Sequence, residues 1–169
     1  QYGSTRGYLE LRQVLAEMIG QNDDIQCSPD QILITTGSAQ GLDLACRIFL
    51  DPDDIVLVGL PSYFGGTGTI ASHEAKTIGI AVDEEGIQTD LMEEKLAALQ
   101  KAGKAVKAVY VIPNFQNPTG VTLTLNRRKK LLELAERYQF IIFEDDPYGE
   151  LRFEGQRLPS LMALDEANC

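Results

Sequence analysis

Polar and aromatic side chains suited to binding a small molecule gather in four short segments of the sequence. The first is a Gly-Ser-Ala-Gln segment, whose backbone N–H groups and hydroxyl suit an anion when they open a helix. The second holds a tyrosine that can stack on a flat ring. The third is an Asn-Pro-Thr-Gly turn that aims an amide, and the fourth is an Asp-x-x-Tyr segment. The residues concerned are Ser38, Ala39, Gln40, Tyr63, Asn117, Asp145 and Tyr148.

In combination these groups describe a receptor for a phosphorylated, planar ring with a basic nitrogen. The helix start binds the phosphate, the tyrosine stacks, the amide and the phenol reach a ring oxygen, and the carboxylate pairs with a protonated nitrogen. Pyridoxal 5′-phosphate (PLP) requires all of these contacts. Each segment alone also has a plainer interpretation, as a helix cap, a rim tyrosine, a turn or a structural ion pair. The prediction therefore rests on their combination.

The four segments each follow a predicted β-strand. Apolar runs and periodicity predict strands over residues 31–36, 55–58, 75–82, 107–112 and 140–144, and helices over residues 9–19, 42–50, 63–71, 89–99 and 127–138. This alternation indicates an α/β fold with three layers, α/β/α, around a mainly parallel sheet. Ligands of such sheets bind beyond the carboxyl ends of the strands, so we expect the four segments on one rim.

Composition narrows the class of protein. The 169 residues include 15 Lys+Arg and 25 Asp+Glu, a net charge of −10, and 44% are hydrophobic, which is typical of a globular chain. The acidity argues against nucleic-acid binding by this segment, and no apolar run approaches the ~20 residues of a membrane span. Three cysteines without CxxC spacing indicate a reduced, cytoplasmic protein. The single histidine, His73, argues against a His/Cys zinc site and a Ser-His-Asp triad.

In this order and spacing, the motifs resemble those of fold-type I PLP enzymes of the class I/II aminotransferase family. The resemblance runs along essentially the whole chain, and its last stretch is similar to the aminoadipate/kynurenine-type enzymes. It implies a PLP-dependent transferase-like large domain and transfer of an amino group from an amino acid to a 2-oxo acid. The matching stretches are Tyr2, Gly-Tyr and Leu-Arg within residues 2–12, Thr-Gly-Ser-Ala-Gln-Gly-Leu at 36–42, Pro-Ser-Tyr at 61–63, Asn-Pro-Thr-Gly at 117–120 and Glu-Asp-Asp-Pro-Tyr-Gly-Glu-Leu at 144–151.

The resemblance implies how the first two segments act. Ser38 and Ala39, with Gln40 adjacent, would bind the phosphate of the cofactor, and Tyr63 would stack on its pyridine ring. Tyr2 matches a tyrosine that reaches the phosphate of the neighbouring subunit. We therefore expect a homodimer with shared active sites.

The resemblance also assigns the last two segments. Asn117 and Tyr148 would hydrogen-bond the phenolic oxygen of the cofactor. Asp145, which the Asp-x-x-Tyr spacing selects over Asp146, would pair with the ring nitrogen. Asp145 and Tyr148 are thus the expected catalytic residues, and no metal is expected.

One part of the family's machinery lies outside this sequence. The Schiff-base lysine is expected on a Ser-x-x-Lys-type loop beyond the Asp-x-x-Tyr strand, and residues 149–169 contain no lysine. The lysines present fall in predicted helices, turns or strand starts, where solvated surface charge is the preferred interpretation. We therefore expect residues 1–169 to be the N-terminal part of the large PLP-binding domain, without the small domain and inactive alone.

Two alternatives stay open. GntR/MocR-type transcription regulators carry an aminotransferase-like domain as a ligand sensor. Their turn usually resembles His-Gln-Phe-Pro, where this chain has Asn-Phe-Gln-Asn-Pro at residues 114–118, so the enzyme is favoured. Decarboxylases, C–S lyases and synthases share the fold, which leaves the reaction less certain than the cofactor. The sequence does not identify the amino acid or the 2-oxo acid.

Overall fold

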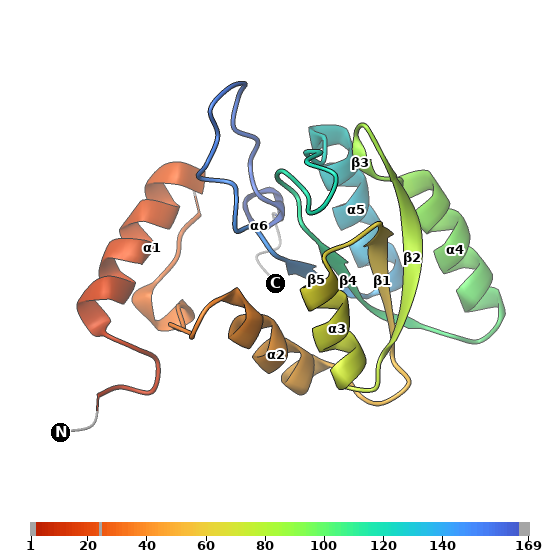
Figure 1. Ribbon diagram of the computed structural model, residues 1–169, viewed down its shortest axis with the longest axis horizontal. Helices are drawn as coiled ribbons and strands as arrows, with labels where there is room; N and C mark the ends of the chain where they lie inside the picture. Colours follow the sequence, from red (N-terminus) through yellow and green to blue (C-terminus); the bar gives the residue numbers. More distant parts are fainter. Residues whose placement is uncertain (1–2, 24, 166–169) are drawn as a thin grey trace.

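A five-stranded sheet forms the centre of the structure, a computed structural model that describes residues 3–23 and 25–165. The strand order is β3-β2-β1-β4-β5 (Figure 1). β1 pairs in parallel with β2 and β4, and β4 pairs in parallel with β5, whereas β3 is antiparallel to β2. The strands are β1 (Ile55–Leu60), β2 (Lys76–Asp83), β3 (Gly86–Ile87), β4 (Val106–Val111) and β5 (Ile141–Glu144).

Helices cover both faces of this sheet. α2 (Ser38–Phe49) and α3 (Phe64–Ser72) lie on one face, and α4 (Thr89–Lys101) and α5 (Leu125–Tyr138) lie on the other (Figure 1). The expected three-layer α/β/α arrangement around a mainly parallel sheet is confirmed. Connections that return each chain segment to a parallel neighbour require such covering helices.

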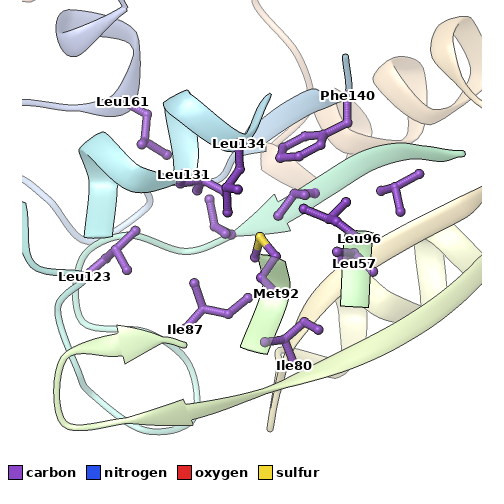
Figure 2. Close-up of a cluster of buried hydrophobic side chains, with 13 residues drawn as sticks. Leu57, Ile80, Ile87, Met92, Leu96, Leu123, Leu131, Leu134, Phe140 and Leu161 are labelled. Atoms are coloured by element: carbon purple, nitrogen blue, oxygen red, sulfur yellow. The ribbon is translucent and has the colours of Figure 1, made fainter. Parts of the chain in front are cut away.

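The central strands β1 and β4 are apolar at almost every position because both of their faces are buried. On β1, Val56 and Val58 belong to the core cluster beneath α2 and α3, whereas Leu57 belongs to the cluster beneath α4 and α5. β4 alternates in the same way, which matches the two-residue period of a strand. Figure 2 shows the second cluster, in which Met92 and Leu96 of α4 meet leucines of α5 over the sheet.

Three shorter or peripheral elements complete the chain: α1 (Leu9–Asp23), the 3-10 helix η1 (Pro29–Gln31) and α6 (Leu161–Leu164). α1 lies apart from the sheet (Figure 1), and its apolar face is largely uncovered. Its exposed large apolar residues are Leu9, Leu11, Val14 and Met18. Among the described residues, no helix has both the length and the apolar character needed to cross a bilayer.

The strand predicted over residues 31–36 is wrong. The structure makes Pro29–Gln31 a 3-10 helix and leaves the following residues extended without a sheet partner. Ile34 makes one backbone hydrogen bond, donating to the carbonyl of Arg6 at 3.0 Å, and Leu33 is 51% exposed. An apolar β-branched run favours extended backbone, but a strand also needs an adjacent strand edge. No described strand lies beside this segment.

Candidate cofactor site

The carboxyl ends of β1, β4 and β5 lie next to one another because these strands are parallel neighbours. The segments that follow them carry three of the four predicted groups of site residues. α2 is oriented so that its first turn lies toward the side on which β1 ends (Figure 1). The strand register and the helices therefore gather segments that are far apart in the sequence.

Asp145 is held in place from both its backbone and its side chain. Its N–H donates to the carbonyl of Val111 at 2.9 Å, and one carboxylate oxygen, Oδ2, accepts a hydrogen bond from the phenol of Tyr110 at 2.7 Å. Tyr110 is 1% exposed. Burial, followed by the hydrogen bond to the Asp145 carboxylate, raises the pKa of Tyr110 far above its ordinary value. The phenol is therefore a permanent donor.

Two adjacent glycines at the start of α3 accommodate two tyrosine rings. A β-carbon on Gly65 would overlap the ring of Tyr63, and a β-carbon on Gly66 would come within 2.5–2.8 Å of ring atoms of Tyr110. Tyr63 precedes α3 as its N-cap residue and is 42% exposed, so its ring is available for stacking. The glycine pair thus lets α3 pack closely against both rings.

The first turn of α2 is an exposed, uncapped helix start. Gly37, the N-cap residue, has φ +79° and ψ 167°, a conformation that essentially only glycine adopts, and no side chain caps the turn. Ser38 and Ala39 are exposed in this turn. Gln40 folds back, and its side-chain oxygen accepts a hydrogen bond from the N–H of Thr36 at 2.6 Å. The N–H groups of this turn remain available to an anion.

The turn that carries Asn117 is tied to the loop after β1 by the buried side chain of Gln116. The amide nitrogen of Gln116 donates to the carbonyl of Pro61 at 2.9 Å, and its oxygen accepts from the N–H of Thr119 at 3.0 Å. The amide of Asn117 itself has no protein partner among the described residues. It is half-buried, so it lies at the rim with its hydrogen-bonding capacity unused.

A fully buried arginine, Arg128 of α5, supports the rim from below. Its guanidinium donates to the side-chain oxygen of Asn114 at 2.8 Å, and the amide of Asn114 donates to Asp146 at 2.8 Å. Burial lowers the pKa of Arg128, while the charges of Glu144 and Asp146 act in the opposite direction. The other acceptors of Arg128 are the carbonyls of Leu123, Pro159 and Pro113, at 2.9, 2.9 and 3.1 Å.

Three of the residues predicted from the sequence lie close to Tyr110. Asp145 accepts the hydrogen bond of Tyr110, and Tyr63 and Tyr148 lie near enough to raise the pKa of Tyr110. Tyr148 also packs against the core cluster beneath α2 and α3. Tyr2 lies outside the described residues. The lysines lie elsewhere: Lys76 begins β2 and pairs with Asp53 at 2.5 Å, and the others lie on α4, α5, the loop after α4 or near the start of β4.

Three residues that support this site were not predicted from the sequence. Tyr110, Gln116 and Arg128 act through other residues and belong to no motif. For Tyr110 the sequence does carry a signal, because its hydroxyl is the one polar side-chain group in the middle of the apolar run Ala-Val-Tyr-Val-Ile. For Arg128 the signal is ambiguous, because Arg-Arg-Lys-Lys at residues 127–130 looks like a solvated charge run.

Comparison with known proteins identifies the family. The Aminotransferase class I and II profile matches residues 1–168. The chain belongs to this family. It is 49% identical to aromatic-amino-acid aminotransferase 1 of Thermococcus litoralis, over 98% of this chain and 40% of that protein. It is 40% identical to the 2-aminoadipate transaminase of Thermus thermophilus, over 97% of this chain and 38% of that protein.

Solved structures of family members superpose on the chain. The kynurenine aminotransferase of Pyrococcus horikoshii, determined in complex with PMP, KYN and KYA, matches with a TM-score of 0.93 and 48% identity, over 98% of this chain and 41% of that one.

A regulator, the HTH-type transcriptional regulator YdeL of Bacillus subtilis, is 34% identical over 98% of this chain and 34% of its own length. The chain therefore spans about two fifths or less of the relatives it matches.

Proposed function

We propose that the protein to which this chain belongs is a PLP-dependent aminotransferase that moves an amino group from an amino acid to a 2-oxo acid. The observation that carries the proposal is Asp145, a carboxylate at the end of β5 that a buried tyrosine holds by one oxygen. Its other oxygen has no partner among the described residues. Membership of the Aminotransferase class I and II family supports the same activity.

The residues present fit this cofactor because their free hydrogen-bonding groups match its polar atoms. The Asn117 amide and the Tyr148 phenol have no protein partner within the described ranges, and both lie on segments that follow parallel strands. The uncapped first turn of α2 offers N–H groups at the positive end of a helix dipole. A basic ring with a phosphate and a phenolic oxygen satisfies all of them.

Each residue then has a distinct role in binding and orientation. The N–H groups of Ser38 and Ala39 and the hydroxyl of Ser38 would hold the phosphate, and Tyr63 would cover one face of the ring. Asn117 and Tyr148 would donate to the phenolic oxygen. Asp145 would accept a hydrogen bond from the protonated ring nitrogen and stabilise its charge. When bound, PLP supplies an electron sink for charge that develops on the substrate.

The remaining machinery must come from the rest of the protein. The lysine that moves the substrate proton and the arginine that binds its carboxylate are proposed to lie outside residues 1–169, since the lysines of this chain lie on α4, on α5, in the loop after α4 or near the starts of strands. We propose accordingly that residues 1–169 form the first part of the large domain. A cytoplasmic homodimer is proposed with it, and light scattering on the full-length protein tests the dimer.

The activity is tested on the full-length protein mixed with PLP. We expect a cofactor absorbance band that changes when an amino acid is added and is restored by a 2-oxo acid. Aromatic amino acids, kynurenine and 2-aminoadipate form the first panel, because relatives are named for them. Asp145→Asn should abolish the response, and Asp51→Asn, at an exposed position between α2 and the start of β1, is the control. A wild-type protein without any amino-acid-dependent change would refute the proposal.

A second candidate is the ligand-sensing domain of a GntR/MocR-type regulator, because such a regulator aligns over nearly the whole chain. The same site would bind PLP without turnover. The two functions differ in a single measurement. An enzyme converts the amino acid in proportion to time, whereas a sensor shows a saturable spectral change and binds promoter DNA through another domain.

A further inference from the structure

The central feature is a buried tyrosine that joins the middle of the sheet to the candidate site. Tyr110 pairs in register with Phe143 of β5, two residues before Asp145. Its hydroxyl spans to Asp145 Oδ2 at 2.7 Å, across 35 residues of sequence. The ring packs beneath Gly66, so it cannot move away from this contact toward α3. The hydrogen bond to Asp145 fixes the hydroxyl of Tyr110, and the contact with Gly66 fixes its ring.

Because of this contact, the two carboxylate oxygens of Asp145 have different environments. Oδ2 accepts from a donor that never ionises in the physiological range, because burial raises the pKa of Tyr110 and the nearby carboxylate raises it further. A hydrogen bond to a carboxylate favours its charged form. Oδ1 is left without a protein partner among the described residues. Rotation of the carboxylate about its Cβ–Cγ bond would break the contact to Tyr110.

We propose that Tyr110 is a positioning residue of the cofactor site, which fixes the carboxylate plane of Asp145 and presents Oδ1 to the ring nitrogen of the cofactor. The inference rests on the proposed function. Tyr110 touches neither cofactor nor substrate in this assignment and acts only through Asp145. Gly66 is part of the same device, because a side chain there would displace the ring.

The test uses Tyr110→Phe in the full-length protein, which removes one hydroxyl and leaves the ring. Tyr138→Phe is the matched control, since Tyr138 is half-buried at the end of α5 in the core cluster on the other face of the sheet. We measure PLP affinity by titrating the cofactor-free protein, and the pH dependence of the bound cofactor's absorbance. Loss of a hydrogen bond to a charged group predicts about tenfold weaker PLP binding. The pH of the absorbance change should also shift.

A double-mutant cycle with Asp145→Asn separates positioning from a general structural effect. In the Asp145→Asn background, the charge that Tyr110 stabilises is gone, so adding Tyr110→Phe should change PLP affinity by less than about twofold. Equal losses in both backgrounds, or wild-type affinity and pH dependence for Tyr110→Phe, would overturn the inference. A wild-type protein that fails to bind PLP at all would instead sink the proposed function, so the two failures are distinguishable.

Discussion

Replacing the buried arginine of α5 gives the most demanding test of how the rim is supported. In Arg128→Met, the new side chain keeps the volume of the aliphatic stem but donates no hydrogen bonds. The substitution removes the donor of four oxygens, which now accept at 2.8–3.1 Å. The carbonyls of Leu123 and Pro159 then have no partner among the described residues. The Pro113 carbonyl keeps the N–H of Leu123 at 2.8 Å, and the Asn114 oxygen keeps Arg152 at 3.4 Å. It also removes the buried positive charge that interacts with Glu144 and Asp146.

The expected cost follows from these contacts. Leaving a buried carbonyl without a donor costs about 1–3 kcal/mol. Removing one partner of a buried charge network costs about 3–5 kcal/mol in total. The total is smaller than the sum of the lost contacts because the unfavourable desolvation of the guanidinium is removed as well. We therefore expect the free energy of unfolding to fall by about 3–5 kcal/mol. Because the carbonyls belong to the loops that follow β4 and β5, PLP affinity should fall as well.

The assay is urea unfolding of the full-length protein, followed by circular dichroism. Arg137→Met is the matched control: it lies on the same helix, is 48% exposed and pairs with Glu93 and Glu133 at the surface. Such a pair contributes about 0–1 kcal/mol. A loss for Arg128→Met no larger than that for Arg137→Met would refute the reasoning that the buried guanidinium supports the rim.

Three further predictions concern the glycines and one ion pair. Gly66→Ala should destabilise the protein in thermal unfolding, because its β-carbon would meet the ring of Tyr110, which is 1% exposed and has no room to move. A β-carbon on Gly65 would meet the ring of Tyr63 instead, but Tyr63 is 42% exposed and can rotate toward solvent, so Gly65→Ala should cost little stability. Equal effects would contradict this. A β-carbon at Gly37 meets no atom within 4 Å, but alanine there must adopt φ +79°, so we expect Gly37→Ala to lower the free energy of unfolding by about 1–3 kcal/mol. The substitution should weaken the binding of PLP more than it weakens the binding of unphosphorylated pyridoxal. Equal weakening of both ligands would count against this prediction. The hydrogen bond from Arg127 lowers the pKa of Asp83 below its usual 3.8, so this pair stabilises the protein above that pH and the contribution is lost as pH falls through the lower native pKa. Asp83→Asn should flatten the acid limb of stability against pH, and an unchanged limb would exclude the pair as its source.

Much of the architecture is predictable because buried parallel strands carry an unambiguous sequence signal. β1 and β4 are apolar at almost every position, since helices cover both faces. The helix whose apolar residues lie within 42–50 begins at Ser38, so the Gly-Ser-Ala-Gln segment opens it as expected. The failure at residues 31–36 has the opposite cause. Local composition favours extended backbone, but pairing depends on a neighbour that local sequence does not specify.

In the candidate site, the motif residues are predictable from the sequence, whereas the residues that hold them in place are not. Asp145 and Asn117 can be predicted because the motifs that contain them recur within a family. Tyr110, Gln116 and Arg128 act through hydrogen bonds that span 35, 55 and 14–31 residues of sequence. Such contacts exist only once the sheet is assembled. No pattern within a short window of sequence reports them.

The long sequence separation of these bridges also bears on how the protein matures. The loops after β1, β4 and β5 take up their positions only when the three strands have paired in register. A ligand that contacts all of these loops therefore binds the assembled sheet and has no comparable affinity for partly folded chains. At a concentration of 100 times Kd, such a ligand stabilises the assembled state by about 2.7 kcal/mol. A sufficient supply of such a ligand would then raise the yield of the assembled protein.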